Sequence, residues 1–194
     1  MNESLTPSTH IAKITATAHQ RVNVIFHAFV SRDIVMLLRD YTTYVRPILE
    51  FNTVVWSPSL KCDIRSVEKV QRKFTKCLPG YGDLSYVERR AKLNLKTLEL
   101  RKLHYGLVMC YKIVFKIIQL RFSDFFVFST LPTRGHPHKL QVNHAPVNAR
   151  RNFFACRVVK LWNSLPADTI DFSTLVRFRT SLHNTDFGSF LTVD

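Results

Sequence analysis

The segment from Tyr44 to Pro79 constrains the fold of this chain most, because its second half separates apolar and cationic residues onto two faces. At about 100° per residue, one arc of roughly 140° collects apolar positions: Leu60, Ile64, Val67, Val70, Phe74, Cys77 and Leu78. A separate arc of roughly 120° collects six cations: Lys61, Arg65, Lys69, Arg72, Lys73 and Lys76. A helix from about Leu60 to Cys77 is therefore expected, with one buried face and one cationic face.

Signals at both ends delimit this helix. Ser59 is suited to be the N-cap, and Pro79-Gly80 should stop the helix. Asp63 falls in the first turn, where a negative charge suits the exposed N–H groups. We therefore expect the six cations to lie on a rigid surface that faces water.

The whole chain is basic. Its 194 residues include 28 Lys and Arg against 14 Asp and Glu, which gives a net charge of +14 and a pI near 10.0. This excess favours a polyanionic partner. Of the two polyanions considered, nucleic acid is favoured over an anionic membrane surface. The alternative is a basic surface that is only solvated; the clustering of charges on faces favours nucleic acid over it.

The sequence lacks the signatures of metal-binding, secreted and membrane-spanning proteins. The four cysteines are far apart and show no zinc-binding spacing, so we expect no metal site and no cofactor. The N-terminus has no apolar segment of the secretory type. The apolar run 107–120 contains two lysines and is too short to span a bilayer. An intracellular protein of the nucleus or cytoplasm, without a membrane partner, is expected.

Apolar residues recur at three- and four-residue steps through most of residues 1–120, which predicts a mainly α fold. Pro47 should kink or restart the chain, and Ser85 with Glu88 forms a capping-box pattern. Helices are expected over 9–28, 31–45, 60–77, 85–93 and from Thr97 onward. Packed through their apolar stripes, they form a basic helical cluster assigned to residues 1–120.

Residues 121–194 are assigned to a small α or α+β tail. The runs 124–128 and 139–143 flank a turn at 133–137, which allows a small hairpin. A helix is expected from Arg150 to Ser164, and Ser173-Thr174 should cap a last one.

The tail also contains a second electropositive region, because no acidic residue occurs between Asp124 and Asp168. The residues expected to bind nucleic acid there are Arg134, His136, Arg150, Arg151 and Arg157. The histidines of this region match no standard metal site with Cys156. Aromatic residues between the cations could stack on bases. Phe154 and Trp162 share a helical face, however, which is more typical of a core.

Seven short runs, in this order, carry a resemblance to a known family. They are 46–51 (RPILEF), 55–58 (VWSP), 68–74 (EKVQRKF), 133–136 (TRGH), 152–154 (NFF), 157–159 (RVV) and 162–166 (WNSLP). Together they resemble the region after the palm in reverse transcriptases of non-LTR retrotransposons of the LINE type, jockey-like clades. The likeness covers the chain from about Ser8 to His183.

The resemblance implies a thumb, within 1–120, and a C-terminal tail, without the catalytic palm that would lie upstream of residue 1. The family's palm binds Mg²⁺ through paired aspartates, and no adjacent Asp-Asp pair occurs here. We therefore assign no catalytic residue, and we expect no RNA-directed DNA polymerase activity from this chain alone. The implied partners are RNA, DNA or their hybrid, bound without sequence preference, and a palm-like protein surface.

Two further hypotheses remain open. In the first, the chain is a domesticated module that binds a protein through exposed apolar residues such as Phe26, Phe29 or Leu38. In the second, it is the product of a truncated open reading frame without a selected function, and cooperative unfolding would argue against that hypothesis.

Overall fold

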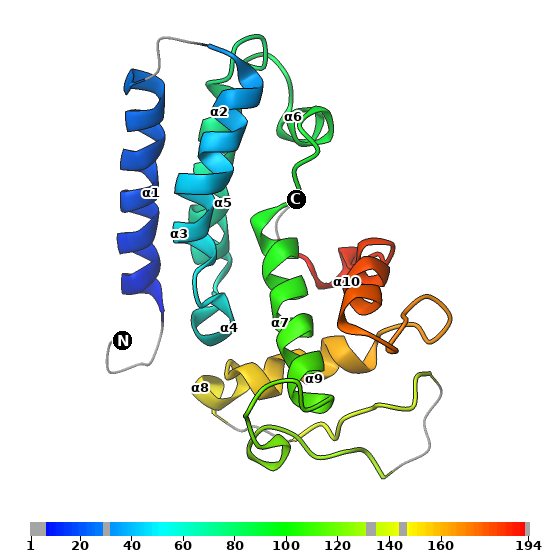
Figure 1. Ribbon diagram of the computed structural model, residues 1–194. Coiled ribbons are helices and arrows are strands. Elements are labelled where there is room, and N and C mark those ends of the chain that lie inside the picture. Colours follow the sequence, from blue (N-terminus) through cyan, green and yellow to red (C-terminus); the bar gives the residue numbers. More distant parts are fainter. Residues whose placement is uncertain (1–6, 29–31, 131–134, 144–146, 193–194) are drawn as a thin grey trace. The chain divides into compact units, whose positions relative to one another are not determined.

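The computed structural model describes residues 7–28, 32–130, 135–143 and 147–192. These residues form helices and no strand, which confirms the mainly α prediction (Figure 1). The elements are α1 (Ser8–Ala28), α2 (Ile34–Asp40), the π-helix η1 (Tyr41–Val45), α3 (Arg46–Glu50), α4 (Thr53–Trp56), α5 (Lys61–Lys76), α6 (Tyr86–Lys92), α7 (Leu98–Val114), the 3-10 helix η2 (Phe122–Asp124), α8 (Asn148–Arg151), α9 (Phe154–Asn163), α10 (Leu175–His183) and the 3-10 helix η3 (Gly188–Phe190).

The chain divides into two compact units. The first unit comprises Met1–Lys102 with Leu191–Asp194, and the second comprises Leu103–Phe190. The boundary near residue 120 that we assigned from the sequence stays a prediction.

In the first unit, α1 packs along α5, and α2, η1 and α3 lie beside α1 (Figure 1). Ala18 and Val22 of α1 and Val70 of α5 are fully buried in one apolar cluster. Phe74 of α5 stacks on Tyr41 of η1, with 4.3 Å between the ring centroids. Because the apolar face of α5 is buried in this cluster, the opposite face of the helix is exposed to solvent.

The restart expected at Pro47 is a π-helical turn followed by α3. The Arg46 N–H donates to the Tyr41 carbonyl, five residues back in the chain. Pro47 lies at the start of α3, where a missing amide donor leaves no helical hydrogen bond unmade. The helical path therefore continues past the proline with an extra residue, and Tyr41 and Val45 both reach the core.

The capping box before α6 is confirmed, and the cap expected for α5 is not. The Ser85 hydroxyl accepts from the Glu88 N–H at 3.3 Å, and the Glu88 carboxylate accepts from the Ser85 N–H at 2.7 Å. In α5, Leu60 is the N-cap residue and no side chain caps the helix, so Ser59 does not have the expected role. The buried Asp63 instead accepts from the Ser8 hydroxyl of α1 at 2.7 Å.

Aromatic rings form the core of the second unit. Trp162 of α9 and Phe178 of α10 are fully buried, and their ring centroids are 5.8 Å apart. Tyr111 of α7 stacks on Phe178 at 4.6 Å and donates its hydroxyl to the Phe172 carbonyl. Phe154 is also buried, whereas 52% of Phe153 is exposed. The core prediction for Phe154 and Trp162 is therefore confirmed.

The tail differs from expectation in two places. The runs 124–128 and 139–143 pair only through a single antiparallel bridge between Phe128 and Leu140, and residues 122–124 are a 3-10 helix. The helix expected from Arg150 to Ser164 is split into α8 and α9 at Asn152 and Phe153. Four aromatic side chains within residues 122–128 pack on one another and on Phe154, and this packing overrides the alternating pattern.

Candidate nucleic-acid interface

The cationic face of α5 lies on the solvent side of the helix, as the sequence predicted. Lys61, Arg65, Lys69, Lys73 and Lys76 are exposed, and Arg72 is half-buried at one edge of the face. None of the five exposed cations forms an ion pair with a carboxylate in the part of the chain that the structure describes. The positive charge of this face is therefore not neutralised locally.

Helix α1 borders this face on one side. The Lys73 ammonium donates to the Asn23 side-chain oxygen at 3.2 Å. His19 lies one turn earlier in α1. Its partial burial, and then the nearby charges of Lys73 and Lys69, lower its pKa below 6.5. A protonated His19 would thus add to a surface that already repels positive charge.

Helix α6 borders the face on the other side through Tyr86. The Arg72 guanidinium lies over the Tyr86 ring, 4.7 Å from its centroid. Arg90 and Arg89 of α6 approach the same ring at 5.1 and 5.8 Å. We call Arg72, Arg89 and Arg90 with Tyr86 the arginine–tyrosine cluster. It extends the positive surface of α5 onto a second helix.

A buried polar network fixes the orientation of α5 below the cluster. Glu68 accepts from the Tyr86 hydroxyl and, at 2.9 Å, from the Leu98 N–H. Gln71 donates to the Tyr86 oxygen at 2.9 Å and accepts from the Tyr41 hydroxyl at 3.2 Å. Burial raises the pKa of Glu68, and burial beside Glu68 raises that of Tyr86. These bonds join α5 to η1, α6 and the start of α7, so the cationic face cannot rotate freely.

Among the described residues, the cations that the sequence predicted in the tail differ in exposure. Arg134 lies outside the described residues. Arg150 and Arg151 are exposed on α8. Burial lowers the pKa of Arg157 to about 10, and its guanidinium donates to the Asn152 carbonyl at 3.5 Å.

His136 is buried rather than displayed, with only 2% of the residue exposed. Its Nε2 donates to the Trp162 carbonyl at 2.9 Å, and its ring lies edge-on to the Trp162 indole. Burial, together with Lys139 and His138, lowers its pKa. A side chain in this position does not reach a bound strand without a rearrangement, and we leave it out of the proposed surface.

Two motifs that looked separate in sequence hold each other in the second unit. Besides the His136 bond, the Trp162 indole N–H donates to the His138 carbonyl at 2.7 Å. The Asn163 side chain pairs with both the N–H and the carbonyl of Leu140, at 2.9 and 2.7 Å. The 135–140 segment and the end of α9 are therefore joined by hydrogen bonds. The side chains of these two motifs have a structural role in packing the second unit.

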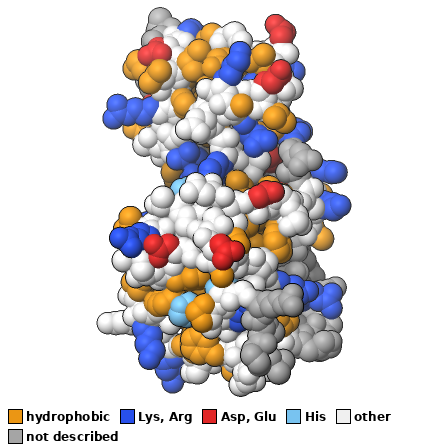
Figure 2. All heavy atoms as spheres, turned by 90° about the vertical axis from the view of Figure 1, so that its right-hand side faces the viewer, with side chains coloured by type: hydrophobic (Ala, Val, Ile, Leu, Met, Phe, Trp, Pro, Cys, Tyr) orange, Lys and Arg blue, Asp and Glu red, His pale blue; other side chains and the backbone are white. Residues whose placement is uncertain are grey.

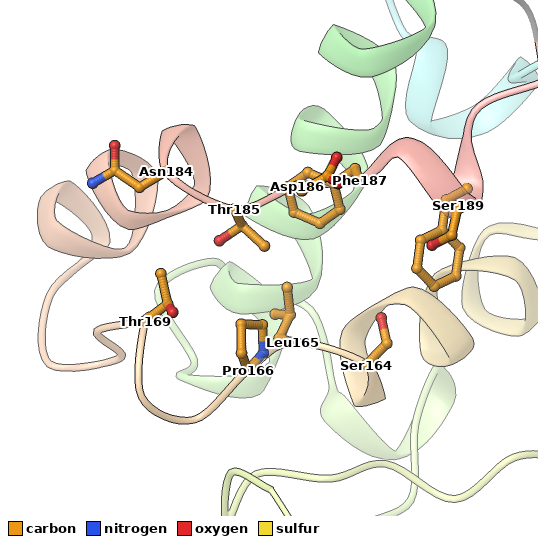
Figure 3. Close-up of a pocket in the computed structure, with 10 residues that line it drawn as sticks. Ser164, Leu165, Pro166, Thr169, Asn184, Thr185, Asp186, Phe187 and Ser189 are labelled. Atoms are coloured by element: carbon orange, nitrogen blue, oxygen red, sulfur yellow. The ribbon is translucent and has the colours of Figure 1, made fainter.

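A pocket of about 470 Å³ lies where the chain leaves α9 and α10 (Figure 3). Its lining is mainly apolar and hydroxyl-bearing and includes Leu165, Pro166, Thr185, Asp186 and Phe187. A carboxylate and no cation line it, so it suits a polyanion poorly. Within the described residues, no three or more His, Cys, Asp or Glu side chains gather where they could hold a metal ion.

Figure 2 shows Lys and Arg side chains, together with some Asp and Glu side chains, on the side of the molecule on which Figure 1 draws α6. No helix among the described residues is both long and apolar enough to cross a membrane.

Comparisons with protein-family models, with curated proteins and with solved structures found no match for this chain.

Sequence reasoning found the cations of α5 but missed the groups that flank them. The sequence placed Tyr86 only in a capping-box segment, and it gave no reason to assign Arg90 or His19 to the site. The one available signal was composition: Arg89 and Arg90 directly follow Glu88 in a short helix next to the basic one. Nothing in the sequence indicated that their guanidinium groups meet Arg72 at a single ring.

Proposed function

We propose that the chain binds nucleic acid without sequence preference, through the cationic face of α5. The observation that carries this proposal is the row of five exposed cations along one 16-residue helix. Lysine and arginine side chains in such a row contact phosphates, which are the same in every sequence. The resemblance to the thumb of LINE-type reverse transcriptases supports the same proposal, because a thumb holds a template–primer duplex.

The proposed partner is RNA, DNA or an RNA/DNA hybrid. Six cations lie on or at the edge of the face. If each neutralises one phosphate of a duplex, log affinity falls with log salt concentration at a slope near −5. We assign no catalytic role to the chain, and the Mg²⁺ chemistry of the parent family would belong to a palm.

The test is fluorescence anisotropy with labelled duplexes of unrelated sequence, each measured from low to physiological salt. We expect equal affinities for the sequences at each salt concentration and a slope between about −4 and −6. A flat salt dependence, or a preference for one sequence, would contradict the proposal.

A second function is favoured by a separate observation, the large apolar side chains exposed on the first unit. Two of the residues that we expected in this role are not free, because Phe26 packs on Phe74 and Leu38 is partly buried against the core. Phe29 lies outside the described residues. Exposed instead are Phe51 (77%), Val35 (74%), Val55 (63%) and Tyr44 (61%). Such side chains are suited to a protein partner. Association that depends on protein concentration and ignores salt would support this function over the first.

A further inference from the structure

The arginine–tyrosine cluster places three positive charges close together, whereas the cations of α5 are spread along the helix. Three guanidinium carbons lie within 5.8 Å of one ring centroid. Glu68 is the acidic group that interacts with Tyr86, and Arg90 and Arg72 also act on its charge. With Glu68 ionised, the cluster carries 3 − 1 = +2 charges.

Glu68 does not use the hydrogen-bonding capacity of Arg89 and Arg90. Its two carboxylate oxygens accept from neutral donors, the Tyr86 hydroxyl and the Leu98 N–H. Arg89 is 6% exposed and donates Nη1 to the Leu84 carbonyl at 2.9 Å. The Nε atoms of Arg89 and Arg90 are buried and have no hydrogen-bond partner within the described residues. Buried charged donors left unpaired are costly, so an acceptor placed there would be bound strongly.

The three arginines differ in their exposure to solvent. Arg72 and Arg90 are half-buried, whereas Arg89 is buried. Cation–π contact with Tyr86 restrains the guanidinium planes, which reduces the conformational entropy lost when a ligand binds. A compact anion with several oxygens suits this arrangement, because each guanidinium offers parallel N–H donors.

We propose that Arg72 and Arg90 beside Tyr86, with the charge of the buried Arg89 added to theirs, bind a dianionic phosphomonoester, the group at the phosphorylated end of a nucleic-acid strand. The inference rests on the proposed function, because the adjacent cations of α5 would hold the rest of the strand. The charge of the cluster favours this group over an internal phosphodiester, which carries one negative charge. The cluster therefore distinguishes a phosphorylated end from a hydroxyl end, whereas the α5 row does not.

The first experiment compares duplexes of identical sequence that end in a phosphate or a hydroxyl, at the 5′ and at the 3′ end. We expect one phosphorylated form to bind about tenfold more tightly than its hydroxyl counterpart, the scale of one hydrogen bond to a charged group. Equal binding of all forms overturns this inference and leaves the proposed function standing. Failure of every duplex to bind overturns the proposed function as well.

Two variants of matched charge separate the cluster from the row. Arg90→Gln should abolish the preference for the phosphorylated end, whereas Arg65→Gln should weaken both forms equally and keep the preference. Arg90→Lys keeps the charge without the planar fork and should keep only part of the preference. Loss of the preference in Arg65→Gln would contradict the assignment to the cluster.

A measurement on the unaltered protein guards against variants that fail to fold. In ¹H–¹⁵N spectra, the Nε–H signals of Arg89 and Arg90 should shift saturably as inorganic phosphate is added, and chloride at equal ionic strength should not reproduce the shift. Competition of inorganic phosphate with the phosphorylated duplex would show that both sources use one site. Shifts that follow ionic strength alone would overturn the site.

Discussion

Glu68 is a carboxylate enclosed by α5, α6 and α7, with 2% of the residue exposed. A buried charge of this kind is tolerated because both oxygens accept hydrogen bonds and because Arg90 and Arg72 lie nearby. Burial still raises the pKa of Glu68, so these contacts stabilise its carboxylate less than water would. In the printed sequence, Glu68 directly precedes Lys69 of the cationic face; only the tertiary contacts show that its carboxylate is enclosed.

Glu68→Ala should destabilise the first unit by roughly 3 kcal/mol, because the Tyr86 hydroxyl and the Leu98 N–H lose their acceptor while buried. Urea unfolding followed by circular dichroism measures the change. Asp83→Asn, an exposed loop substitution, is the control and should leave the midpoint nearly unchanged. A similar midpoint for both variants would contradict a stabilising role for Glu68.

His136 should make stability depend on pH. Its folded pKa lies below the ordinary value of 6.5, so the unfolded state binds more protons between the two values. Stability should therefore fall as the pH drops below about 6.5 toward the lowered pKa. Glu68 acts in the opposite sense, because its folded pKa is raised.

The measurement is the unfolding midpoint at pH 7.5 and at pH 5.5 for the natural protein and for His136→Phe. The variant should lose part of the decline, while His19 and His138, whose pKa values are also lowered, keep the remainder. An unchanged decline in the variant would show that His136 does not contribute.

At the scale of single elements, α5 combines two requirements. Its buried face packs on α1 through Val67, Val70 and Phe74, and its opposite face carries the cations. The separation was readable in sequence because an α-helix repeats every 3.6 residues. The register of α2 to α3 was not, because the π-helical turn before Pro47 depends on how Tyr41 packs against Phe74.

Removing charge from α5 should weaken binding of all nucleic-acid sequences alike. Arg65→Gln with Lys69→Gln should reduce the salt slope by about two, one unit for each phosphate that is no longer neutralised. The matched control is Arg39→Gln with Arg179→Gln, which removes the same net charge from exposed positions on α2 and α10. Equal weakening in both double variants would indicate that net charge, rather than the α5 face, drives binding.

At the scale of the whole molecule, both units are basic, but their cations are arranged differently. In the first unit a single helix orders them in a row. In the described part of the second unit, Arg150 and Arg151 are exposed on the short α8, and Arg157 is half-buried. The two electropositive regions of the sequence are therefore not equivalent as docking surfaces.

Hydrogen exchange should locate the bound nucleic acid. We expect added duplex to slow amide exchange in α5 and α6 and to leave α9 and α10 nearly unchanged, because bound phosphates suppress opening of the helices that they contact. Mass spectrometry of the exchanged peptides reads this out. Protection that appears mainly in α8 and α9 would transfer the interface to the second unit.

The sequence by itself determined the helical class, the amphipathic α5 and the capping box of α6, because each depends on residues within a few turns of one another. Only the tertiary structure decided that three arginines meet at Tyr86, that Glu68 is enclosed and that His136 is buried against Trp162. Those outcomes join residues up to 30 positions apart. Local periodicity contains no information about such distances, because side chains from separate helices meet only when the apolar core sets their relative positions.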